Sequence, residues 1–98
     1  MPKRVHHCYY VYIMTNKPNG VLYIGVTGGI DDRVERHKAG KGSKFTKKYN
    51  LDKVVYMEEF QYINDAIARE KQLKRWHRQW KINLIEEDNP GWKDLLPS

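Results

Sequence analysis

The chain has 98 residues and carries 18 Lys and Arg against 12 Asp and Glu, which gives a formal net charge of +6. A chain of this length supports one modest hydrophobic core and excludes a second, so we expect a single domain over residues 1–98 with its core at about 9–92. The basic balance, with a pI near 9.5, favours a polyanionic partner such as nucleic acid.

Cys8 is the only cysteine, which excludes an internal disulfide and a cysteine-rich zinc site. The first seven residues lack the apolar run of a signal peptide, and no segment approaches the roughly 20 apolar residues of a membrane span. We therefore expect a cytoplasmic protein with no membrane partner.

Two strands, at residues 9–14 and 21–26, are predicted on either side of the turn sequence Pro18-Asn19-Gly20. Because strand side chains alternate, a hairpin of odd register collects the aliphatic residues on one face. These are Val11, Ile13, Leu22, Ile24 and Val26. The residues on the opposite face are Tyr10, Tyr12, Tyr23 and Gly25. Packing alone does not require several phenol hydroxyls beside a glycine, so we interpret this second face as a place where a polar group is bound.

The middle of the chain predicts a helix, a basic segment and a third strand. Residues 30–38 predict the helix, with Asp31 and Asp32 near the positive end of its dipole. Residues 38–53 hold six lysines and one aspartate, and they form either a solvated loop with a helical turn or a ridge that contacts phosphates. Residues 51–60, with the run Val54-Val55-Tyr56-Met57, predict the third strand.

A long helix is predicted from about Ala66 to Trp80 or beyond, capped by Asn64 or Asp65. Its apolar stripe, at roughly 100° per residue, contains Ile63, Ala66, Leu73, Trp80 and Leu84. Glu70 falls inside this stripe. An inward carboxylate is costly unless it holds a cation or is paired, and Lys74 one turn later is the alternative partner.

The remaining aromatic residues near the C-terminus are interpreted as structural. Trp76, Trp80 and Trp92 are assigned to the core and its cap, and His77 to packing, with a bend of the helix before it. Asn89-Pro90-Gly91 ends the last helix, and residues 92–96 are expected to fold back.

The order β-β-α-(α)-β-α-α predicts a small α+β domain. Its three-stranded, mostly antiparallel sheet is flanked by helices, because a sheet of this size needs helical cover to be stable.

Arg33 and His37 are neighbours on one face of the first predicted helix, and we expect them at the sheet edge near Gly25. A guanidinium binds phosphate oxygens and stabilises charge in a phosphoryl transition state, whereas the alternative is a surface pair with Asp32 or Glu35. Hydroxyls, an arginine, a histidine and an inward carboxylate are together the parts that a single-metal phosphodiesterase requires.

The basic residues of the 38–53 segment and of the long helix are candidates for contacts with nucleic-acid phosphates, with a solvated surface as the alternative. These candidates are Lys41, Lys44, Lys47, Lys48, Lys71, Lys74, Arg75 and Arg78.

A family resemblance rests on four segments. They are Tyr10-Val11-Tyr12, then Tyr23-Ile24-Gly25 after ten intervening residues, Arg33-x-x-x-His37, and Ala66-x-x-x-Glu70-x-x-Leu73-Lys74. Together they closely resemble the GIY-YIG endonuclease superfamily over residues 9–92, and most of all its small standalone bacterial-type members.

The resemblance implies a role for each matching residue. Tyr12 lies beside the nucleophilic water as its general base or orienting group, and Tyr23 hydrogen-bonds the reacting phosphate or water. Arg33 contacts the scissile phosphate, and Glu70 holds a divalent metal, Mg²⁺ or Mn²⁺. His37 gives a further contact or transfers a proton.

Three positions depart from the family pattern or leave it open. Tyr10 replaces the glycine of the first motif, and Val26 stands where some relatives carry a lysine. Many members also place an asparagine after the metal-binding glutamate, and both Asn83 and Asn89 fit that description.

The sequence therefore predicts a divalent-metal-dependent endonuclease that hydrolyses DNA phosphodiester bonds. With no second domain to read bases, we expect weak sequence specificity or selection of a substrate shape such as a branched or damaged duplex. The alternative is a non-catalytic nucleic-acid-binding module on the same fold.

Overall fold

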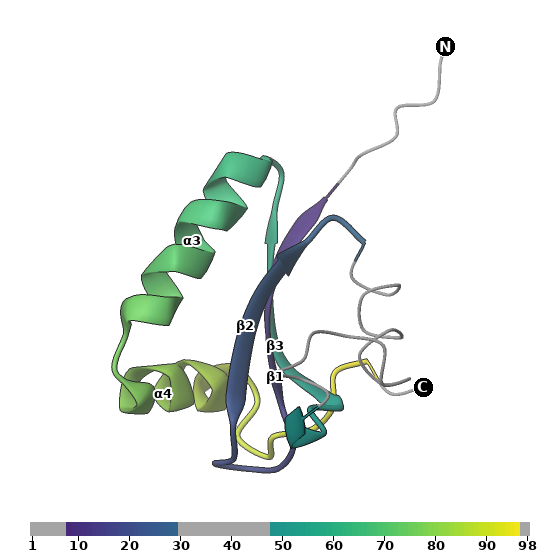
Figure 1. Cartoon of the computed structure of the whole chain (residues 1–98), viewed down its shortest axis with the longest axis vertical. Helices are drawn as coiled ribbons and strands as arrows, with labels where there is room; N and C mark the ends of the chain where they lie inside the picture. The colour runs from purple at the N-terminus through teal and green to yellow at the C-terminus, as the bar shows by residue number, and fades with distance from the viewer. Residues whose placement is uncertain (1–7, 30–47, 97–98) are drawn as a thin grey trace.

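The computed structural model describes residues 8–29 and 48–96. Its elements are β1 (Tyr9–Thr15), β2 (Leu22–Thr27), β3 (Lys53–Phe60), α3 (Ile63–Arg75) and α4 (Arg78–Asp88). The strands form an antiparallel sheet of order β2-β1-β3, so β2 is an edge strand. Both helices lie on one side of this sheet, α3 along it and α4 across its lower end (Figure 1). The predicted α+β class and three-stranded sheet are confirmed.

The β1–β2 hairpin has the odd register that sorts aliphatic residues from tyrosines. Val11 pairs with Val26, Ile13 with Ile24, and Tyr12 with Gly25. The turn closes through a hydrogen bond of 2.9 Å from the Gly20 N–H to the Lys17 carbonyl. Asn19 adopts the positive φ of 58° that such a tight reversal favours.

Both faces of the sheet are packed. The cluster under α3 and α4 contains the aliphatic residues of the hairpin together with Ala66, Leu73, Ile82 and Ile85. The opposite cluster is made by Tyr12, Met14, Leu51 and Val54, with Tyr23 and Leu96 packed against it. The face of the sheet that carries Tyr12 and Tyr23 is therefore partly apolar, because a second small hydrophobic core forms there.

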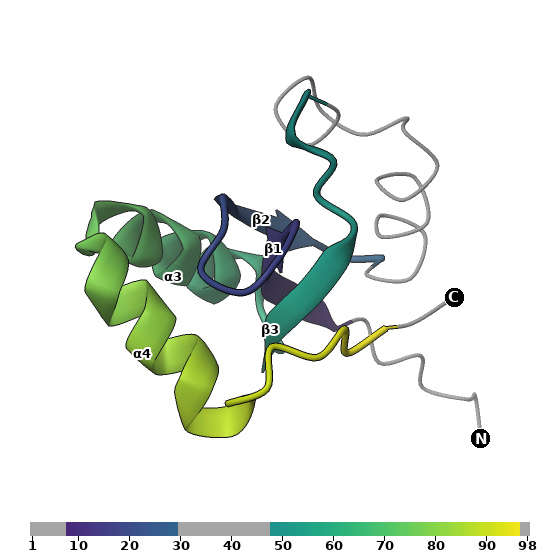
Figure 2. The same cartoon turned by 90° about the horizontal axis from the view of Figure 1, so that it is seen from below.

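The C-terminal segment closes over the lower end of the sheet, as predicted. Figure 2 shows it passing from α4 beneath β3. Trp92 is only 4% exposed, and the Leu95 N–H donates to the Val54 carbonyl at 2.7 Å. This contact brings Leu96 to the cluster around Tyr12.

The helix predicted from about Ala66 to Trp80 is divided into two helices, at the position before His77 where a bend was expected. α3 ends at Arg75, and Trp76 and His77 have extended backbone with ψ of 148° and 149° before α4 begins. α3 also starts earlier than expected, after Tyr62, so Asn64 and Asp65 lie inside its first turn and do not cap it.

The break between the helices changes which side chains are buried. Ala66 and Leu73 keep the predicted inward direction on α3, whereas α4 turns Ile82 and Ile85 into the core. Trp80 was expected in the stripe but is 52% exposed, and Ile63 is 38% exposed. The predicted stripe therefore holds only for the part that lies on α3.

The predicted helix at residues 30–38 and most of the lysine-rich segment lie outside the described residues. Within residues 8–29 and 48–96, neither helix has the length and apolar character needed to cross a membrane.

Candidate active site

Tyr12 and Tyr23 lie beside each other on adjacent strands. Their ring centroids are 6.3 Å apart, with the ring planes tilted by 45°. Tyr12 is 1% exposed, whereas Tyr23 on the edge strand is half-buried. Tyr23 is therefore the more accessible phenol of the pair.

Gly25 makes room for the phenol end of Tyr12. A Cβ atom at residue 25 would lie 2.5 Å from both Cζ and Oη of Tyr12, far inside van der Waals contact. The glycine is therefore required by space, because any side chain here would push the Tyr12 hydroxyl away.

Glu70 faces the sheet from α3, between the fully buried Ala66 and Leu73. Its side chain is 17% exposed, and its Oε2 atom lies 3.1 Å from the Lys74 Nζ atom. The carboxylate is thus inward, as expected, and it also has the lysine partner that was the alternative.

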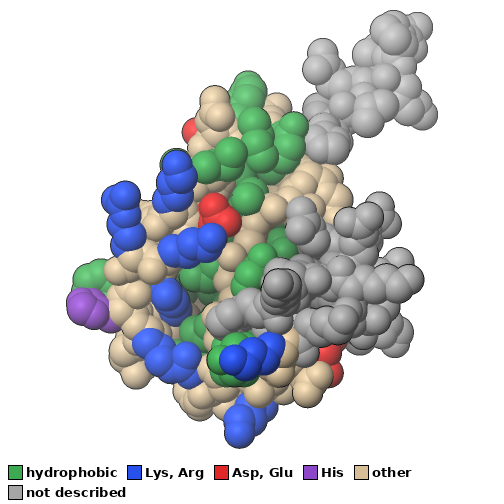
Figure 3. Space-filling view, in the orientation of Figure 1, with side chains coloured by type: hydrophobic (Ala, Val, Ile, Leu, Met, Phe, Trp, Pro, Cys, Tyr) green, Lys and Arg blue, Asp and Glu red, His purple; other side chains and the backbone are tan. Residues whose placement is uncertain are grey.

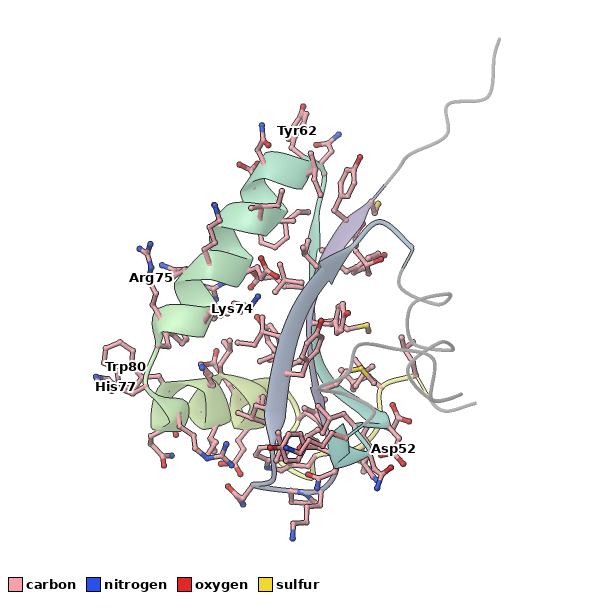
Figure 4. All side chains as sticks on the ribbon, in the orientation of Figure 1. Asp52, Tyr62, Lys74, Arg75, His77 and Trp80 are labelled. Carbon is pink, nitrogen blue, oxygen red and sulfur yellow. The ribbon has the colours of Figure 1, made fainter. Side chains whose placement is uncertain are left out.

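The structure places the tyrosines and Glu70 on opposite faces of the sheet, with Tyr12 and Tyr23 in the cluster away from the helices and Glu70 on α3. Beside the edge strand β2 lies a cavity of about 280 Å³, lined by Leu22, Tyr23, Ile24, Lys74 and Lys81. Lys74 extends from α3 toward β2 (Figure 4). This lysine therefore both lines the cavity and forms an ion pair with Glu70.

The donor chemistry of Glu70 fits a hard divalent cation. Mg²⁺ prefers oxygen ligands, keeps several waters, and commonly binds through one or two carboxylates together with substrate phosphates. Among the described residues, no three His, Cys, Asp or Glu side chains gather as a ready-made metal site. Glu70 therefore fits a site that water and substrate oxygens complete.

Comparison with known proteins decides the family. Residues 8–83 match the GIY-YIG catalytic domain model. The chain belongs to the GIY-YIG family. It is 42% identical to a UPF0213 protein of Staphylococcus haemolyticus over 81% of this chain and 95% of that protein. It is 37% identical, over the same shares, to UPF0213 proteins of Staphylococcus aureus.

A solved structure supports the same assignment. The solution NMR structure of a UPF0213 protein from Bacillus halodurans matches 89% of this chain and 92% of that one, with a TM-score of 0.57 and 29% identity. The GIY-YIG family is a family of nucleases, and the chain resembles its small standalone bacterial members, as the sequence motifs predicted.

Two GIY-YIG motif residues and three of the basic residues fall outside the described part of the chain. These are Arg33, His37, Lys41, Lys44 and Lys47.

The basic residues that are described have different surroundings. Lys48 is exposed and lies 5.4 Å from the centroid of the Tyr49 ring. Lys71 and Arg75 are exposed on α3, on the side of the molecule where Figure 3 shows many Lys and Arg side chains. Arg78 donates from Nη2 to the carbonyls of Asn19 and Gly20, so it also fastens α4 to the hairpin turn.

Asn89, one of the two candidates for the family asparagine, has a structural role. Its Nδ2 atom donates to the carbonyls of Val55 at 3.1 Å and Lys93 at 2.8 Å, and its Oδ1 atom accepts from the Lys93 N–H at 3.0 Å. Val55 lies where the β1–β3 register shifts, so Asn89 joins this irregularity to the C-terminal segment. Asn83 is exposed and accepts a hydrogen bond from Gln79 on the same helix.

Sequence reasoning missed a polar network between β3 and α3. The Tyr56 hydroxyl donates to Glu58 at 2.7 Å, and Arg69 Nε donates to the other oxygen of Glu58 at 2.9 Å. Burial and the Glu58 carboxylate raise the pKa of Tyr56 to about 12. Glu58 and Arg69 are eleven residues apart on different elements, so no local spacing signals the pair.

Cys8 shows no sign of activation. A hydrogen bond with Glu59 and, to a smaller extent, burial raise the pKa of its thiol. The protonated form of the thiol is therefore favoured.

Proposed function

We propose that this protein is a divalent-metal-dependent endonuclease that hydrolyses DNA phosphodiester bonds. The observation that carries the proposal is the Tyr12–Tyr23 pair at the β2 edge, next to a cavity whose Lys74 also binds the inward Glu70. Membership of a nuclease family supports phosphodiester hydrolysis as the reaction. The two phenols, the Lys74 ammonium and the Glu70 carboxylate are groups that this reaction can use.

The two phenols have different tasks in this proposal because their exposure differs. Tyr23, half-buried at the edge, hydrogen-bonds the phosphate or the attacking water. Tyr12 is 1% exposed, so it acts through its hydroxyl at the Gly25 end, where it orients the water or accepts its proton.

Glu70 would hold the divalent cation, Mg²⁺ or Mn²⁺. Such an ion stabilises negative charge on the phosphoryl and leaving-group oxygens. Lys74 pairs with Glu70 and lines the cavity, so its ammonium group would donate to a phosphate oxygen bound there.

Arg33 and His37 complete the proposed set on the strength of the family motif. Arg33 offsets the charge that develops on the scissile phosphate, and His37 contacts or protonates an oxygen. Lysines along residues 38–53 and on α3 bind the neighbouring phosphates without reading sequence. We therefore propose weak sequence specificity or selection by DNA shape, as in a branched or damaged duplex.

The direct experiment incubates the purified protein with supercoiled plasmid and Mg²⁺ or Mn²⁺, and follows nicking by gel electrophoresis. Glu70→Gln and Arg33→Ala should each lower the rate on the order of 10² to 10³ fold, as expected for loss of a charged group that stabilises the transition state. Glu87→Gln is the matched control, because it removes the same charge from an exposed position on α4.

Equal nicking by the wild type and by both variants would overturn the proposal. The alternative, a module that binds nucleic acid without cleaving it, predicts salt-sensitive binding that is unchanged by chelators and by Glu70→Gln. The family assignment and the inward direction of Glu70 favour the enzyme.

A further inference from the structure

An exposed aromatic group lies where α3 and α4 meet, away from the Tyr12–Tyr23 site. It consists of Trp76, His77 and Trp80. We call these three residues together with Arg75 the tryptophan corner. Figure 4 shows Arg75, His77 and Trp80 on the outer side of this corner, whereas Lys74 extends toward the sheet. Trp80 is 52% exposed, in contrast to the 4% of Trp92 in the core.

The Trp80 ring is fixed in place although half of it is in water. Its centroid is 5.8 Å from that of Trp76 and 5.2 Å from that of His77, both in edge-on geometry. The Arg69 guanidinium lies 5.2 Å from the Trp76 ring and supports it from α3. A ring held in this way loses little conformational entropy when a flat ligand stacks on it.

The charge around the tryptophan corner has one sign. From Lys71 to Lys81 the sequence contains no Asp or Glu and five cations, Lys71, Lys74, Arg75, Arg78 and Lys81. The last turn of α3 is basic, and the first turn of α4 has no acidic residue. This charge is complementary to a polyanion.

Aromatic side chains beside cations are the combination that binds single-stranded nucleic acid, because bases stack on the rings while cations contact the phosphates. Base pairs inside a duplex are stacked on one another and do not offer their faces. An exposed tryptophan in basic surroundings therefore distinguishes unpaired bases from paired ones.

We propose that the tryptophan corner binds an unpaired base in a single-stranded segment of the substrate, with Trp80 as the stacking surface and Arg75 as a phosphate contact. This inference rests on the proposed nuclease function and deepens it, since it makes DNA with unpaired bases the preferred substrate class. Branched and damaged duplexes are members of that class.

The test measures binding by fluorescence anisotropy, in the presence of a chelator so that no cleavage occurs. The labelled probes are an oligothymidine strand, a blunt duplex, and the same duplex with an unpaired arm. Trp80→Ala should weaken binding of the strand and of the armed duplex by about 10-fold, and Trp80→Phe should retain most of the affinity. Binding of the blunt duplex should change by less than about twofold, because it depends on phosphate contacts.

Tyr62→Ala is the matched control. Tyr62 is 65% exposed at the opposite end of α3, but Asp65 rather than a cation lies in its helical turn (Figure 4). This variant should bind all three probes as the wild type does. Arg75→Gln should weaken binding of all three and lower the salt dependence by about one phosphate contact.

Wild-type affinity of Trp80→Ala for the strand, or an equal loss for the strand and the blunt duplex, would overturn the inference. The binding assay contains no divalent metal, so its result does not depend on cleavage. Selective binding together with no plasmid nicking in the separate assay would refute only the nuclease proposal. Nicking without selective binding would refute the stacking proposal alone.

Discussion

The two faces of the sheet carry tyrosines with different surroundings. Under α3 and α4, Tyr56 is 6% exposed and its hydroxyl is held by Glu58, which Arg69 binds in turn. On the opposite face, Tyr12 and Tyr23 contact each other near a glycine and reach the edge strand. The Tyr56 hydroxyl is thus bound in a network that joins β3 to α3, whereas Tyr23 lies on the edge strand and is only half-buried.

The largest effect on stability should come from the helix-covered face. Ile85→Ala removes a fully buried side chain of α4 and should lower the free energy of unfolding by about 2–5 kcal/mol. Chemical denaturation followed by circular dichroism measures this loss. Plasmid nicking per folded molecule should stay at the wild-type level, and a selective loss of nicking would show that the two faces are coupled.

The tyrosines of the two faces are compared directly by removing one oxygen atom from each. Tyr23→Phe should reduce plasmid nicking about 100-fold, which corresponds to about 2.7 kcal/mol of transition-state stabilisation. Tyr56→Phe, with the same chemical change, should leave nicking unchanged and lower only the stability. Similar nicking rates for the two variants would contradict the assignment of the site to the Tyr23 face.

A third comparison concerns the room for a side chain at two glycines, Gly25 and Gly29. Gly25→Ala places a methyl group against the Tyr12 phenol and should cost about 1–3 kcal/mol of unfolding free energy together with most of the nicking activity. At Gly29 an added Cβ would meet no atom of the described residues within 4 Å, so Gly29→Ala should change the stability by no more than about 0.5 kcal/mol. Equal behaviour of the two variants in denaturation would contradict the role of Gly25.

The smallest effect is a change in alkaline stability that comes from Tyr56. Its pKa is raised from 10 to about 12 in the folded protein, so the folded state holds this proton more tightly than the unfolded state does. The resulting stabilisation is complete below pH 10 and is lost as the pH rises toward 12. Between these values, wild-type stability should therefore fall more steeply than that of Tyr56→Phe, as measured by denaturation at a series of alkaline pH values. Parallel pH profiles would show that Tyr56 ionises equally easily in both states.

The candidate site was predictable from the sequence where the positions involved are local or alternate regularly. The hairpin turn and the period of two along each strand placed Tyr12 beside Gly25. The inward direction of Glu70 was predictable because helical spacing puts it between Ala66 and Leu73, although spacing alone did not decide between a cation and Lys74. The exposure of Tyr23 and the burial of Tyr12 could not be predicted, because they depend on the edge position of β2 and on Leu51, Val54 and Leu96 from distant segments.

The sequence by itself determined the sheet, the two chemical faces of the hairpin and the family, because these follow from residue periodicity and motif spacing. The sequence favoured a bend before His77, but only the tertiary structure decided that α3 ends at Arg75 and that α4 starts in a new direction at Arg78. That break turns Ile82 and Ile85 into the core and leaves Trp80 in solvent. It also lets Arg78 reach the hairpin turn, a contact between residues almost 60 positions apart that no local pattern records.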